Sequence, residues 1–256
     1  MIELGIKVNQ NNFPQTSTTL FQTKLDAEPS AFWWLLFPPV MIAISLIFRV
    51  INPDFYYNYI EGELGIVENG TVLLLLPAFL FGIVAIFLTR GMDSPLLTGW
   101  VILNTLGCFY FMGEEASWGQ HWFGWAADGV FADHPRGETN IHNTNHWFDQ
   151  KPKVVVELWT IVGGIIAPIV AWFTGRHNKG SATTLWYWIW PTFVCLPTAL
   201  IGVIIKNIER IRQAMETTFP APFDIRFSEP QEYYFGLFFF LYMYSLMRRI
   251  RAARNS

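Results

Sequence analysis

The feature that most constrains this chain is a series of long apolar runs. Crossing the hydrocarbon of a bilayer takes roughly 20 largely apolar residues in a helix, because only a helix pairs its backbone polar groups within one segment. Six such runs occur in the 256 residues. We therefore predict an all-α, polytopic membrane helix bundle with about six transmembrane helices. The predicted spans are residues 32–50, 70–89, 95–112, 154–174, 185–205 and 233–247.

Composition agrees with a bilayer environment. Only 14% of the residues are charged, whereas about 25% is usual for a soluble domain. The chain also has 12 Trp, a residue that concentrates where a bilayer meets water. A net charge of −3 provides no clustered basic surface for phosphate groups, so a nucleic-acid partner is excluded. The lipid bilayer is the predicted partner.

The chain divides into a polar N-terminal segment (1–31), a transmembrane domain (32–247) and a basic tail (248–256). An even number of spans places both termini on one side of the membrane. Arg90 in a tight turn and the four arginines of the tail fall on that side, so we predict that both termini are cytoplasmic. Basic residues also occur in the opposite loops: Arg136, Lys151, Lys153, Lys206, Arg210, Arg212 and Arg226.

Acidic residues separate the two faces more sharply. All but four of the 20 acidic residues fall on the predicted outer side. Carboxylates at helix starts complement the helix dipole, but Glu114 and Glu115 end a predicted helix and repel each other. They require a cationic partner, and both a structural ion-pair network and a functional site are open interpretations. The outer carboxylates at span ends are Glu68, Glu114, Glu115, Glu157 and Glu232, and the candidate cations are Arg49, Lys151, Lys153, a histidine or a metal ion.

A Trp-rich segment, residues 113–125, follows the third span. If the helix continues, Glu114, Ser117 and His121 share one face with Trp118. A carboxylate, a hydroxyl and an imidazole would then converge. The alternative is an aromatic anchor at the membrane interface that carries incidental polar residues.

The next segment places Glu138, His142 and His146 at intervals of four residues. In a helix this spacing lets two imidazoles chelate one metal ion. Carboxylates and imidazoles together are ligands of zinc, iron and manganese. The cofactor is therefore left open: a divalent metal (zinc, iron or manganese) is one interpretation, and the alternative is a set of hydrogen-bonded interfacial histidines. The predicted metal ligands are Glu68, Glu115, His142 and His146.

Three motifs carry a resemblance to a known family. The pieces ELGIVE (63–68), GEEASWGQ (113–120) and ETNIHN (138–143) resemble the ExGxxE, GEExSWGQ and ExNxHN patterns of a poorly characterised family of bacterial polytopic membrane proteins. The resemblance covers the first two thirds of the chain and implies a multi-pass protein of the bacterial inner membrane. In that pattern the position of His121 is often arginine, which leaves His121 outside the predicted essential residues.

Three functions follow from this polar, outward-facing set. The first is a metal-assisted hydrolase or oxidoreductase that acts on a lipid or a lipid-linked substrate. The second is a non-catalytic membrane subunit or scaffold with a partner in a larger complex. The third is a cation or proton transporter. Whether the protein is an enzyme is left open; the predicted catalytic residues are Glu114, Glu115, Ser117, Gln120 and Glu138.

Overall fold

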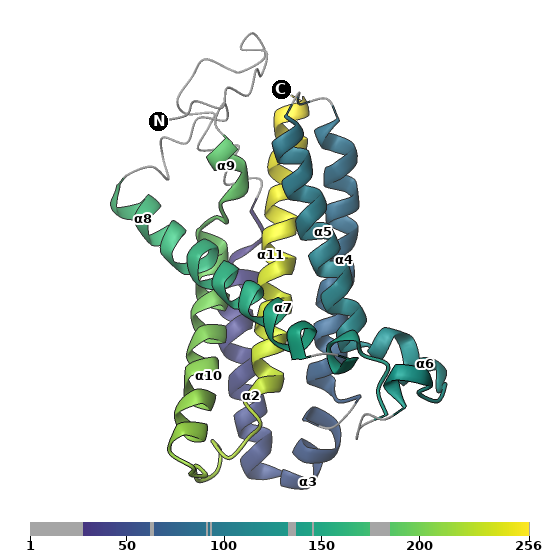
Figure 1. The fold of residues 1–256 in the computed structure, drawn as a ribbon. Coiled ribbons are helices and arrows are strands. Elements are labelled where there is room, and N and C mark those ends of the chain that lie inside the picture. Colours follow the sequence, from purple (N-terminus) through teal and green to yellow (C-terminus); the bar gives the residue numbers. More distant parts are fainter. Residues whose placement is uncertain are drawn as a thin grey trace.

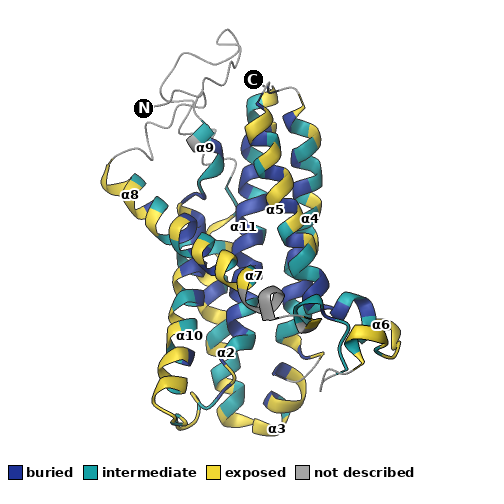
Figure 2. Cartoon of the chain, viewed as in Figure 1, coloured by how far each residue is buried: buried dark blue, intermediate teal, exposed yellow. Residues whose placement is uncertain are grey.

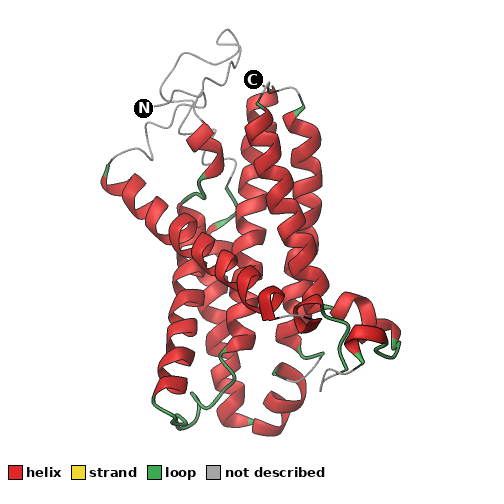
Figure 3. Ribbon diagram, viewed as in Figure 1, coloured by secondary structure: helices red, strands yellow, loops and turns green. Residues whose placement is uncertain are grey.

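A computed structural model describes most of the chain. All regular secondary structure in the described residues is helical (Figure 3), which confirms the all-α prediction. The described ranges are 28–61, 64–90, 92, 94–132, 137–144, 146–174 and 185–255, and within them the side chains of Asn143, of residues 146–150, of Trp186 and of Asn255 are not described.

Within these ranges, five helical stretches are long and apolar enough to cross a membrane. The chain is therefore a multi-pass helical membrane protein. The five stretches are Phe32–Ile51 (η2, Phe32–Leu36, and α2, Phe37–Ile51), Ile66–Thr89 (α4), Pro95–Glu115 (α5), Lys151–Phe173 (most of α7, His146–Trp159, with η7, Thr160–Ile166, and α8, Ala167–Phe173) and Tyr187–Ala214 (α9, Leu185–Ile189, η9, Phe193–Cys195, and α10, Leu196–Ala214).

The sixth predicted span lies in helix α11 (Ser228–Asn255), which has 28 residues but is not among the apolar stretches. Its tyrosines and arginines lower its hydropathy. The helix can carry them because it lies in the centre of the protein, where its side chains face other helices (Figure 2). It packs most extensively against α4 and also against α10.

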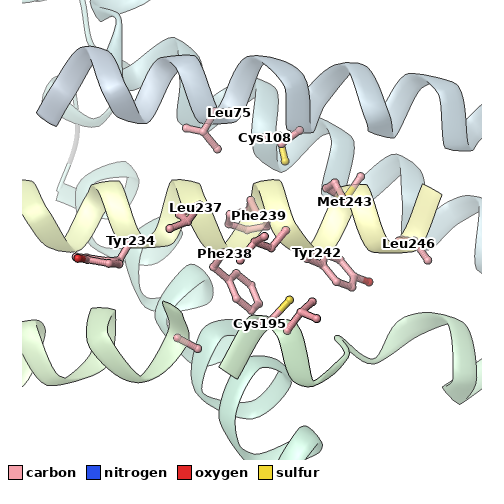
Figure 4. Close-up of a cluster of buried hydrophobic side chains, with 14 of the residues drawn as sticks. Leu75, Cys108, Cys195, Tyr234, Leu237, Phe238, Phe239, Tyr242, Met243 and Leu246 are labelled. Atoms are coloured by element: carbon pink, nitrogen blue, oxygen red, sulfur yellow. The ribbon is translucent and has the colours of Figure 1, made fainter. Parts of the chain in front are cut away.

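The core surrounds the middle of α11. Phe238 and Tyr242 are fully buried and lie between Leu75 of α4 and Cys195, the last residue of η9 (Figure 4). Cys108 and Cys195 are free, buried thiols, as the sequence predicts. The large aromatic side chains of this helix therefore stabilise the bundle through protein contacts rather than lipid contacts.

The three helices α4, α5 and α11 determine where the polar residues lie. Helix α5 returns antiparallel to α4, and α11 runs in the same direction as α4 (Figure 1). Glu68 in the first turn of α4, Glu115 at the end of α5 and Glu232 in the second turn of α11 therefore reach the same end of the bundle. Arg90 and the C-terminal arginines lie at the opposite end.

Short helical elements make up the connections. They are α3 (Pro53–Phe55), η3 (Tyr56–Ile60), η4 (Ser117–Gly119), α6 (Gln120–Phe123), η5 (Gly129–Phe131) and η6 (Ile141–Thr144). The last four form the long connection between α5 and α7, at the end of the bundle that carries Glu68 and Glu232.

Gly82 is the glycine of α4 at which an added side chain meets the closest neighbours. A Cβ atom there would lie 2.2 Å from Oγ1 of Thr105 and 2.9 Å from Cε of Met243. Gly82→Ala should lower the free energy of unfolding by about 1–3 kcal/mol, because the packed neighbours must move. Thermal unfolding of the purified protein measures this. Gly107→Ala is the matched control, since nothing lies within 4 Å of its Cβ position; equal effects of the two variants would contradict the prediction.

Candidate active site

The site begins where helix α5 ends, at Glu115. The predicted continuation of this helix through His121 is wrong, because Ser117 (φ 44°) and Trp118 (φ 55°) adopt left-handed conformations that are uncommon for residues with a side chain. The chain turns and the indole of Trp118 folds back over Gly113. A Cβ atom at Gly113 would lie 2.8 Å from that ring, so the turn requires glycine there.

The carboxylate of Glu114 holds this turn together. It accepts four hydrogen bonds: from Nε1 of Trp118 (2.7 Å), from the backbone N–H groups of Ile141 (3.1 Å) and His142 (2.9 Å), and from Nδ1 of His142 (2.7 Å). The side chain is buried, with 8% of its surface exposed. A carboxylate with four donors is well stabilised even away from water. Glu114 therefore ties the segment around His142 to the end of α5.

The contact with Glu114 also determines the state of His142. A neutral imidazole has one N–H, and here Nδ1 must carry it in order to donate to the carboxylate. Nε2 of His142 is then the nitrogen without the proton. Hydrogen-bond donors therefore stabilise the Glu114 carboxylate at the position where the sequence predicts a cationic partner.

Ser117, His121 and Glu68 form a chain of polar contacts. Oγ of Ser117 lies 2.8 Å from Nε2 of His121, and Nδ1 of His121 lies 3.7 Å from Oε1 of Glu68. Glu68 comes from the first turn of α4, whereas His121 lies in α6. A carboxylate beside Nδ1 favours the tautomer with the proton on Nδ1, which leaves Nε2 to accept a proton from the serine hydroxyl.

Gln120, predicted as catalytic, connects α6 to the segment before η6. Its Nε2 donates to the carbonyl groups of Gly137 (2.8 Å) and Trp125 (3.1 Å), and its Oε1 accepts from the backbone N–H of Thr139 (2.8 Å). The hydroxyl of Thr139 donates to the backbone carbonyl of Ser117 (2.8 Å). Gln120 and Thr139 are positioning residues that hold the Ser117 turn and the His121 helix together.

An acidic group lies beside this chain. Glu115 is placed electrostatically among Glu68, Glu229 and Glu232, with Lys153 as a compensating charge. Burial, reinforced by the neighbouring Glu232 carboxylate, raises the pKa of Glu229 from 4.5 to about 7. Burial also raises the pKa of Glu232, against the opposing charge of Lys153. The raised pKa values favour the protonated forms of Glu229 and Glu232.

Glu229→Gln should stabilise the protein above pH 7 and not below pH 4.5, because the folded state favours the neutral acid that glutamine mimics. The raised pKa gives Glu229 a favourable contribution below the unfolded value of 4.5, and that contribution is lost as pH rises through about 7. We expect a gain of about 2 kcal/mol at pH 8.5. Melting temperatures at both pH values measure it, with exposed Glu216→Gln as control; a gain independent of pH would contradict the prediction.

The predicted metal centre depends on a helix that does not form. Residues 137–140 have no regular structure, Ile141–Thr144 is a 3-10 turn, and α7 begins only at His146. Glu138 therefore does not stack above His142; its carboxylate accepts a hydrogen bond from Asn140 (3.3 Å). No three described His, Cys, Asp or Glu side chains are arranged to hold a metal ion. The His146 side chain lies outside the described residues, so its role stays a prediction.

Two other polar residues belong to separate ion pairs. Arg49, a candidate partner for Glu114 and Glu115, instead pairs with Asp224. Glu157 of α7 pairs with Arg210 of α10, with 2.7 Å between Oε1 and Nη1. The prediction that Glu157 lies at a helix start is wrong, because α7 already begins at His146 and Arg210 compensates the Glu157 charge. Glu68, Glu114, Glu115 and Glu232 gather with the Ser117 turn.

Three members of this site lie outside the predicted site residues. The i, i+4 spacing of Ser117 and His121 predicts that they converge, but His121 is not among the predicted essential residues because the resembled pattern often has arginine there. Glu229 lies three residues before Glu232, close to one helical turn. Nothing in the sequence pattern distinguishes Thr139, since its contacts depend on how the connection folds back on α6.

No protein-family model, no curated protein and no solved structure matches this chain. The resemblance to the bacterial membrane family stays a prediction that rests on the three motifs alone.

Proposed function

We propose that this membrane protein is a serine hydrolase that cleaves an ester in a lipid or lipid-linked substrate. The observation that carries the proposal is the contact chain from Ser117 Oγ through both nitrogens of His121 to Glu68, at 2.8 and 3.7 Å. A serine hydroxyl is a weak nucleophile until an adjacent base takes its proton. A serine, a histidine and a carboxylate in this order supply the nucleophile, the base and the group that orients the base.

The reaction follows from this order. Oγ of Ser117 attacks the ester carbonyl carbon while its proton moves to Nε2 of His121. The tetrahedral intermediate collapses, the C–O bond to the leaving alcohol breaks, and His121 gives the proton to that alcohol. Water then attacks the acyl group on Ser117, again with His121 as base, and releases the acid. Glu68 stabilises the imidazolium that forms in both steps.

Access to Ser117 requires a movement, because its side chain is fully buried. The short helix α6 lies between Gly119 (φ 101°) and Gly124 (φ 72°), two left-handed positions that glycine adopts without strain. They form the turns at which the chain enters and leaves α6, the helix that places His121 beside Ser117. The orientation that the charge pattern predicts puts this site on the periplasmic side of a bacterial inner membrane.

A fluorophosphonate probe tests the proposal directly. The serine oxygen displaces fluoride and forms a stable phosphonate ester, which intact-mass measurement and peptide mapping locate. We expect labelling at Ser117 in the purified protein in nanodiscs, loss of labelling in Ser117→Ala and normal labelling in Ser45→Ala, whose hydroxyl only bonds Met41 of its own helix. If the protein is folded and Ser117 stays unlabelled, the hydrolase proposal is wrong. Co-purification of such a protein with another membrane protein would favour a non-catalytic subunit.

A further inference from the structure

An exposed aromatic group lies next to the proposed active site. Trp122, Phe123 and Trp125, here called the aromatic tip, are 55%, 76% and 43% exposed. The rings of Phe123 and Trp125 stack with 5.9 Å between their centroids. The tip projects sideways from the bundle at α6 (Figures 1 and 2). Large apolar rings that gather on one exposed segment indicate an interaction surface.

The lipid-facing surface of α5 leads to this tip. Leu103, Leu106 and Phe109 are 60%, 59% and 41% exposed and follow one another at helical spacing on a membrane-spanning helix. The ring of Phe109 contacts Trp118, with 5.8 Å between centroids. Trp118 directly follows Ser117. The apolar stripe that faces lipid therefore continues into the wall of the proposed active site.

The tip is also attached to a second span. Nε1 of Trp122 donates to Oδ1 of Asn69 in the first turn of α4 (3.4 Å). Both elements that hold the tip, the end of α5 and the start of α4, are ends of membrane-spanning helices. Trp side chains at such positions favour the headgroup region, where the ring is in an apolar layer and the N–H remains hydrated.

We propose that the aromatic tip inserts into the headgroup–acyl boundary of the bilayer and so holds Ser117 at the depth of the ester carbonyls of bilayer lipids. Ser117 lies only two residues beyond the end of the α5 span. The ester linkages of glycerolipids lie at this boundary, between hydrated headgroups and acyl chains. The substrate class is therefore a bilayer-resident acyl ester rather than a water-soluble one. This part rests on the proposed function.

Site-directed spin labelling measures the depth of the tip without catalysis. Phe123→Cys would carry the label in nanodiscs of phosphatidylethanolamine and phosphatidylglycerol; Cys108 and Cys195 are buried, and unsubstituted protein reports any background. Leu73→Cys on α4, 70% exposed, is the lipid reference, and Thr218→Cys in the exposed α10–α11 loop is the aqueous reference. We expect oxygen, which concentrates in bilayers, to relax the Phe123 label more strongly than a water-soluble nickel complex, as at Leu73. A ratio equal to that at Thr218 overturns the inference and leaves the hydrolase proposal intact.

A kinetic comparison tests the substrate class. Phe123→Ser is expected to slow hydrolysis of a diacyl lipid ester in nanodiscs by about tenfold, from the lost burial of one aromatic side chain. It should leave hydrolysis of a soluble short-chain ester unchanged, because Phe123 contacts none of the three reacting groups. Equal losses on both substrates contradict the proposed depth. If the tip lies in lipid but the wild-type protein hydrolyses neither substrate, the proposed function is overturned and the insertion of the tip still holds.

Discussion

His121→Ala is expected to lower the rate of ester hydrolysis by about a thousandfold or more, because Ser117 then has no base to take its proton. Nε2 of His121 lies 2.8 Å from the serine hydroxyl. The measurement is the initial rate of fatty acid release from a lipid ester in nanodiscs. Rates are compared at equal amounts of folded protein, judged by melting temperature.

The Glu68→Gln variant tests whether Glu68 orients the imidazole of His121, separately from the role of His121 as the base. It keeps the size of the side chain and the imidazole, so the rate should fall less than in His121→Ala, while the melting temperature changes little. Lys151→Ala, an exposed residue at the same end of the bundle, is the control and should retain full activity. A folded His121→Ala protein within tenfold of the wild-type rate would rule out His121 as the base.

Glu114→Ala is expected to produce the largest loss of stability, about 3–5 kcal/mol, because it removes the acceptor of four hydrogen bonds in a buried setting. The backbone N–H groups of Ile141 and His142 and the indole N–H of Trp118 would then lack their partner. Hydrogen exchange followed by mass spectrometry should show faster exchange in the peptide that contains Ile141 and His142. Loss of hydrolysis should accompany it, since the Ser117 turn depends on the same contacts.

Glu115→Ala is the matched control for Glu114. The two carboxylates are adjacent in sequence, but Glu115 accepts none of those four hydrogen bonds and lies near Glu68, Glu229 and Glu232. Its removal relieves repulsion among like charges, so stability should hold or rise at neutral pH. If both variants lost stability equally, Glu114 would not be the hub that ties the Ile141–His142 segment to α5.

Apolar runs predicted the class of the protein well. Five of the six predicted spans coincide with helices that are long and apolar enough to cross a membrane. The sixth predicted span lies within α11, which is not among these apolar stretches, because a helix surrounded by other helices does not have to be apolar toward lipid. Its Tyr234 and Tyr242 hydroxyl groups bond the backbone carbonyls of Pro38 and Ile189, partners that hydropathy does not register.

Two of the predicted catalytic residues contact histidines. Glu114 binds His142 and Ser117 binds His121, at the end of the bundle that carries Glu68 and Glu232. The sequence predicts that these residues meet because they share one face of a helix, but neither helix forms as predicted. Helix α5 ends at Glu115 instead of continuing through His121, and a 3-10 turn at Ile141–Thr144 replaces the predicted helix that would align Glu138, His142 and His146. Helical spacing predicts contacts only within one regular helix. The observed contacts instead connect the turn at Ser117 and the turn at Ile141–Thr144 to the helix ends.

The sequence by itself determined that this chain is a helical membrane protein with its acidic residues at one end, because hydrophobic length and charge distribution act through the solvent and need no knowledge of neighbours. Only the tertiary structure decided which polar groups meet. Ser117 finds His121 because Trp118 folds over Gly113 and binds Glu114, and His121 approaches Glu68 because α4 begins where α5 ends. The contact between His121 and Glu68 joins segments about 50 residues apart in the chain, and a pattern of neighbouring residues cannot predict a contact over that separation.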